Sequence, residues 1–79
     1  MTITISALKP GEYGKICGFL PGDRAYRQKL LAMGLTLNTI FEVVRVAPLG
    51  DPVQIRVRQA DLCLRKAEAG MLQVVRVNA

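Results

Sequence analysis

Glycine and proline divide this chain into segments that are too short for anything but a small, sharply bent fold. Seven glycines and four prolines fall among 79 residues, and most stretches between them alternate apolar with polar side chains. Alternation with a period of two places every second side chain on the same face of a strand. Because chains under about 100 residues rarely form two cores, we expect one mainly β domain spanning residues 1–79.

The alternating segments predict five strands. They span about residues 13–19, 39–46, 53–58, 62–65 and 72–77. In the third of these, Val53, Ile55 and Val57 share one face, which is therefore expected in the core. A helical turn or tight loop is expected before the first strand, at residues 6–12, and a turn or single helical turn before the last, at residues 66–70. This order of elements, with one helix, predicts an SH3-like, partly open β-barrel.

The α-helix is predicted at about residues 23–33. Asp23 suits the N-cap, and no glycine or proline follows until Gly34, which suits the position just after a helix. Apolar side chains recur at helical spacing, at Tyr26, Leu30 and Met33. Basic side chains lie off this stripe, at Arg24, Arg27 and Lys29. The helix is therefore expected to cover the core and to present a basic face to solvent.

Two prolines frame the loop between the second and third predicted strands, residues 47–52 with the sequence APLGDP. Prolines on both sides of a turn reduce its conformational freedom, so Leu49 is expected in one defined place. One interpretation is a well-made turn with an incidental leucine. The other is a preordered apolar contact for a partner, which costs little ordering on binding.

The net charge of +5 favours an acidic partner surface, a nucleic acid or an anionic membrane face. Barrels that bind single-stranded nucleic acid usually add exposed aromatic side chains for base stacking. Of the aromatic residues, Phe19, Tyr26 and Phe41 occupy positions typical of the core, leaving Tyr13. We therefore favour an acidic protein surface over a nucleic acid, with purely solubilising charge as the remaining interpretation.

Catalytic chemistry is not indicated. The chain has no histidine, which removes the commonest general base and a common metal ligand. Its six acidic residues are scattered, and no phosphate-binding loop of the Gly-x-x-x-x-Gly-Lys-Ser/Thr type is present. Cys17 and Cys63 are far apart in the sequence and are expected to be small buried or half-buried apolar residues. We expect no enzyme activity, no catalytic residue and no set of metal ligands.

The beginning of the chain, MTITIS, has no basic region followed by an apolar segment, as a secretory signal would. No apolar run approaches the roughly 20 residues that a membrane-spanning helix needs. We therefore expect a cytoplasmic protein without membrane insertion.

Three stretches together resemble the FeoA family of bacterial ferrous iron transport. They are YRQKLLAMGL at residues 26–35, FEVVRVAPLGDP at residues 41–52 and LRK at residues 64–66. The chain departs from many FeoA proteins at Leu37-Asn38, where those proteins have Pro-Gly. Asparagine tolerates a left-handed backbone, so the turn is expected to survive.

The resemblance implies a cytoplasmic, SH3-like accessory protein that assists FeoB, a membrane permease with a cytosolic GTP-binding domain, in importing ferrous iron. It implies docking on the cytosolic part of FeoB, and recruitment by FeoB to the inner face of the membrane. We assign this docking to the basic face of the helix and to the proline-framed loop. The residues are Arg24, Arg27 and Lys29 for electrostatic steering, and Pro48, Leu49, Gly50 and Asp51 for contact. No resident cofactor is expected, and at most weak or transient binding of ferrous iron. The alternative function is a stand-alone SH3-like regulatory barrel that binds a transition metal or nucleic acid.

Overall fold

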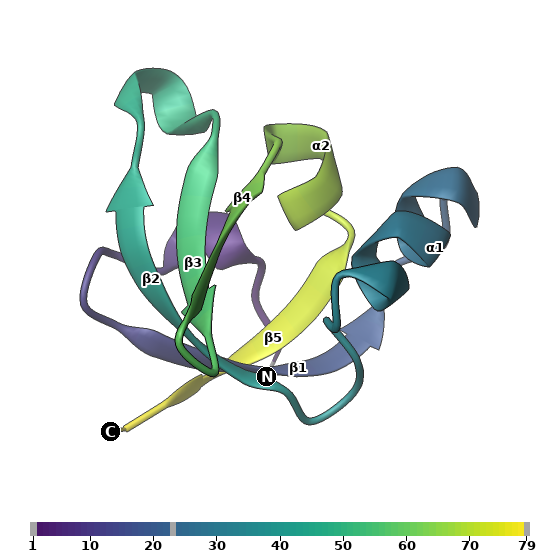
Figure 1. Cartoon of the computed structure of the whole chain (residues 1–79), viewed down its shortest axis with the longest axis horizontal. Helices are drawn as coiled ribbons and strands as arrows, with labels where there is room; N and C mark the ends of the chain where they lie inside the picture. Colours follow the sequence, from purple (N-terminus) through teal and green to yellow (C-terminus); the bar gives the residue numbers. More distant parts are fainter. Residues whose placement is uncertain (1, 23, 79) are drawn as a thin grey trace.

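A computed structural model of the chain describes residues 2–22 and 24–78, which form one antiparallel five-stranded sheet with the order β4-β3-β2-β1-β5 (Figure 1). The strands are β1 (Tyr13–Phe19), β2 (Ile40–Val46), β3 (Val53–Val57), β4 (Ala60–Leu64) and β5 (Leu72–Val77). The helical elements are η1 (Ile5–Ala7), α1 (Arg24–Ala32), η2 (Pro48–Gly50) and α2 (Lys66–Ala69). The sheet curls without closing, which confirms the predicted SH3-like, partly open barrel.

Bulges produce part of this curvature. The pairing of β1 with β5 shifts register between Ile16 and Gly18, and the pairing of β2 with β3 shifts between Val43 and Arg45. A bulge bends its strand and increases the local twist. Cys17 is the extra residue of the first bulge, and its thiol points outward near the carbonyl oxygen of Gln73.

The core lies inside the curled sheet, and the helical elements add Ile5 from η1, Leu30 from α1 and Ala69 from α2 to it. Val53, Ile55 and Val57 are all buried, as their alternation predicts. Phe41 is the largest fully buried side chain. A Cβ atom at Gly14 would lie 2.7 Å from its Cζ atom, so glycine at that position makes room for the ring.

The helix prediction is confirmed in extent but wrong for one core residue. α1 begins at Arg24 and ends at Ala32, and Gly34 follows with a φ of +88°. Leu30 is fully buried, whereas Tyr26 is 38% exposed. Leu30, in the last turn of α1, is the one residue of the described helix that is buried, so the helix reaches the core through its end and Tyr26 stays at the surface. The proposed N-cap, Asp23, lies outside the described residues.

The turn between β3 and β4 differs from prediction. Arg58 does not extend the strand, because Arg58 and Gln59 form a two-residue turn with φ values of +55° and +81°. Such a turn pairs Ala60 directly with Val57, so β4 starts at Ala60 instead of residue 62. The left-handed backbone expected at Asn38 is confirmed, with a φ of +71°.

The prediction of buried cysteines is wrong, because both cysteines are exposed. Cys17 lies in the β1 bulge, which turns its side chain away from the core. Cys63 lies on β4 opposite Gln54, on the face of the sheet that carries polar side chains. Neither cysteine side chain therefore packs in the core.

Candidate interaction surface

The residues predicted for partner contact lie in two places, α1 and the loop between β2 and β3. Figure 1 shows these two elements at opposite sides of the molecule, with α2 between them. Four residues form α2, and a helix of that length has little stability of its own. Side-chain contacts with both neighbouring regions hold it in place.

On one side, α2 is joined to α1 through Glu68. Its carboxylate is 3% exposed and lies 2.6 Å from the Lys29 ammonium. Its other oxygen accepts a hydrogen bond from the Arg65 backbone N–H at 2.9 Å. Lys29, and then the Arg65 N–H, hold the pKa of Glu68 below the usual value of 4.5. The Glu68 carboxylate is therefore ionised, and both of its oxygens have a partner. Lys29 is one of these partners and joins α1 to α2.

On the other side, α2 is joined to the β2–β3 loop through Asp51. The Asp51 carboxylate accepts a hydrogen bond from the Lys66 backbone N–H at 3.2 Å and lies 4.0 Å from the Arg65 guanidinium. The start of α2 thus anchors the end of the loop. Together, the contacts of Asp51 and Glu68 place the loop and α1 in a fixed relation to each other.

The loop itself presents a single leucine. Ala47 and Pro52 pair across its base, and the Gly50 N–H donates to the Ala47 carbonyl at 2.8 Å. Leu49 is 96% exposed and has a φ of +69°, a left-handed conformation that costs a leucine free energy. Backbone conformations of this kind are enriched at ligand contacts and switch regions.

Arg24 and Arg27 lie on the exposed face of α1, as predicted. Among residues 2–22 and 24–78, neither takes part in an ion pair, whereas other basic residues do. Arg56 pairs with Asp61 at 2.9 Å, which lowers the pKa of Asp61 and raises that of Arg56. Arg76 pairs with Glu12 at 3.2 Å. Within the described residues, the first two turns of α1 therefore carry two basic side chains outside any ion pair, as do other exposed basic residues, namely Lys9, Arg45, Arg58 and Lys66.

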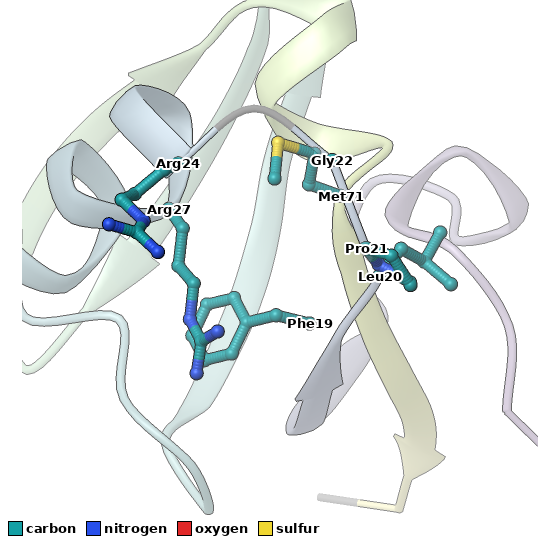
Figure 2. A pocket seen from close by; sticks show the side chains of 7 residues that line it. All are labelled: Phe19, Leu20, Pro21, Gly22, Arg24, Arg27 and Met71. Atoms are coloured by element: carbon teal, nitrogen blue, oxygen red, sulfur yellow. The ribbon is translucent and has the colours of Figure 1, made fainter.

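Sequence reasoning missed a groove beside these arginines. Its volume is about 410 Å³, and it lies between the end of β1, α1 and the residue before β5 (Figure 2). The lining residues are Phe19, Leu20, Pro21, Gly22, Arg24, Arg27 and Met71. Six of these residues fall within residues 19–27 and the seventh, Met71, is distant in the sequence, so the groove depends on a long-range contact that no local pattern announces.

Metal ligands do not converge in the part of the chain that the structure describes. Nowhere among residues 2–22 and 24–78 do three or more His, Cys, Asp or Glu side chains gather as a metal-binding group. The same residues contain no helix that is both long enough and apolar enough to cross a membrane.

Comparison with known proteins places the chain in a family. The model of the FeoA domain matches residues 3–76. A fusion of Fe(2+) transport protein A with the Fe(2+) transporter FeoB from Porphyromonas gingivalis is 29% identical over 75 residues. That match covers 95% of this chain but only 9% of the fusion protein, so the chain corresponds to a small part of it.

Solved structures agree with this match. The crystal structure of an iron uptake regulatory protein, FeoA, superposes with a TM-score of 0.82 at 30% identity, over 98% of this chain and 99% of that one. A manganese-dependent transcriptional repressor in complex with manganese superposes with a TM-score of 0.88 at 16% identity, over 96% of this chain and 37% of that one. The repressor shows a shared fold alone. On the family match and the FeoA structure, this chain belongs to the FeoA domain family, which is associated with ferrous iron transport.

Proposed function

We propose that this chain is a non-enzymatic accessory protein of ferrous iron uptake that docks on the cytosolic part of FeoB. The observation that carries the proposal is the Porphyromonas gingivalis relative, in which a segment similar to this chain and FeoB share one polypeptide. Fusion keeps two domains at high effective concentration, as suits domains that work in contact. Without fusion, the two proteins need a docking surface to stay in contact. Docking on FeoB would hold this chain in the cytoplasm at the inner face of the membrane.

The proposed docking surface combines charge on α1 with an apolar contact in the β2–β3 loop. Arg24 and Arg27 attract an acidic region of the permease and accelerate association. Leu49, presented by Pro48, Gly50 and the anchored Asp51, packs into the partner and slows dissociation. Lys29 contributes to this surface indirectly, because its ion pair with Glu68 holds α1 against α2.

Leu49→Asp is expected to raise the dissociation rate from FeoB about tenfold or more, because an apolar anchor acts mainly on the off-rate. The salt dependence of association should stay as in the wild type. The measurement is binding kinetics on full-length FeoB held in lipid nanodiscs. Leu37→Asp is the matched control, since Leu37 is another exposed leucine, 56% exposed and outside this loop. Equal dissociation rates for the two variants would contradict the role of Leu49.

Iron is the transported substrate in this proposal and is not held tightly by the accessory chain. Tight sites for ferrous iron need several converging nitrogen, sulfur or carboxylate ligands, and this chain has no histidine and only two cysteines. Calorimetry under anaerobic conditions is expected to show weak ferrous iron binding. A one-to-one, sub-micromolar site that is lost in Cys17→Ser or Cys63→Ser would refute this expectation. Likewise, GTP hydrolysis in the assembly is assigned to FeoB, because this chain lacks a phosphate-binding loop.

A further inference from the structure

The groove beside α1 has two chemically different sides. Figure 2 shows the guanidinium groups of Arg24 and Arg27 on one side, and Leu20 and Pro21 on the other. Met71 completes the apolar side, and the Leu20 N–H donates to the Met71 carbonyl at 2.7 Å. This hydrogen bond fixes the two apolar segments against each other. The groove is thus preformed, which reduces the entropy cost of binding.

The Arg27 guanidinium lies over the Phe19 ring, with 5.4 Å between the guanidinium carbon and the ring centroid. A stacked guanidinium uses its flat face and leaves its in-plane N–H donors available. Those donors match the two oxygens of a carboxylate. Stacking also covers one face of the ring, which makes Phe19 a poor platform for a nucleic acid base.

The charges around the groove are not balanced within the described part of the chain. Four of the five carboxylates there pair with other basic residues: Glu12 with Arg76, Asp51 with Arg65, Asp61 with Arg56 and Glu68 with Lys29. The fifth, Glu42, does not line the groove. Arg24 and Arg27 are one helical turn apart, where like charges repel. An external carboxylate between them would relieve that repulsion.

We propose that this groove binds a short acidic-apolar peptide segment of a partner protein. A carboxylate lies between Arg24 and Arg27, and a neighbouring apolar side chain packs against Leu20, Pro21 and Met71. A volume of about 410 Å³ is in the usual range for a site that holds a few side chains. The identification of the partner as FeoB rests on the proposed function. The chemical class of the bound segment is inferred from the groove residues alone.

The first test uses a peptide probe and the full chain. The acetylated and amidated hexapeptide Ala-Leu-Glu-Leu-Asp-Ala is titrated into the ¹⁵N-labelled protein, and amide shifts are followed by NMR. Shifts are expected at Phe19, Leu20, Gly22, Arg27 and Met71. The same peptide with glutamine and asparagine in place of its acids should bind about tenfold more weakly, because charge-assisted hydrogen bonds are lost. Equal shifts from both peptides, or no shifts around the groove, would overturn the proposal.

The second test asks whether FeoB is the partner. Arg24→Glu with Arg27→Glu is expected to weaken binding to full-length FeoB about tenfold or more. Lys9→Glu with Arg58→Asp is the control, because it changes the net charge equally at exposed residues that do not line the groove. Equal losses in both double variants would show that FeoB does not use the groove. Failure of the wild-type chain to bind FeoB would refute the proposed function. The peptide titration would still decide whether the groove binds an acidic-apolar segment.

Discussion

Lys29→Glu is expected to lower the free energy of unfolding by about 1–2 kcal/mol, since the lysine is partly screened by solvent, whereas Arg24→Glu on the same helix should change it by less than about 0.5 kcal/mol. Both residues are basic positions on the exposed side of α1. They differ because Lys29 neutralises the buried carboxylate of Glu68, and reversal of its charge would place two carboxylates together. Urea denaturation of the two variants at pH 7 measures the difference.

The pH dependence of the free energy of unfolding distinguishes loss of the Lys29–Glu68 ion pair from a general destabilisation of α1. The folded-state pKa of Glu68 lies below 4.5, so the pair contributes stability above the unfolded pKa and loses it as pH falls through the lowered folded pKa. Glu68→Gln should therefore flatten the fall in stability below about pH 4.5. Equal destabilisation by Lys29→Glu and Arg24→Glu, with an unchanged pH profile in Glu68→Gln, would contradict the claim that the Lys29–Glu68 ion pair stabilises the contact of α1 with α2.

Phe41→Ala is expected to lower the free energy of unfolding by about 3–5 kcal/mol, a large part of the stability of a domain this small. Gly14→Ala should cost about 1–3 kcal/mol for the opposite reason, since its Cβ atom would lie 2.7 Å from Phe41 Cζ and 3.0 Å from Leu8 Cδ1. The two positions share one space in the core.

The size-compensating double variant tests that arrangement. Phe41→Leu removes the ring atoms that a Cβ at Gly14 would meet. The double variant of Phe41→Leu and Gly14→Ala should therefore lose less stability than the sum of the single variants, by about 0.5 kcal/mol or more. Chemical denaturation of all four proteins completes the cycle. Strict additivity would mean that Gly14 is required for some reason other than the ring.

The sheet was largely predictable because local sequence marks its boundaries. β1 and β5 match the predicted residues 13–19 and 72–77 at both ends. At β4 the prediction failed, since the turn before it uses Arg58 and Gln59 in left-handed conformations that glycine or asparagine usually signals. The alternation of Val53, Ile55 and Val57 predicted their burial because period two is a direct consequence of strand geometry.

The surface was less predictable because its properties come from contacts between distant segments. Arg24, Arg27 and Lys29 look equivalent along the helix, yet Lys29 is committed to Glu68, which follows β4. The groove depends on Met71 meeting the segment after β1. The one local signal at the surface, two prolines around Leu49, did predict a turn, which the structure has as η2 with Leu49 exposed.

Copurification with FeoB tests the central claim of docking most directly. The tagged chain is expressed with full-length FeoB of the same organism, and FeoB is extracted from membranes and captured through the tag with and without guanine nucleotide. We expect FeoB to be retained in near-stoichiometric amount in at least one nucleotide state, and less to be retained by the Leu49→Asp variant. Absence of FeoB from the capture in every nucleotide state, with both proteins folded and present, would contradict the proposed function.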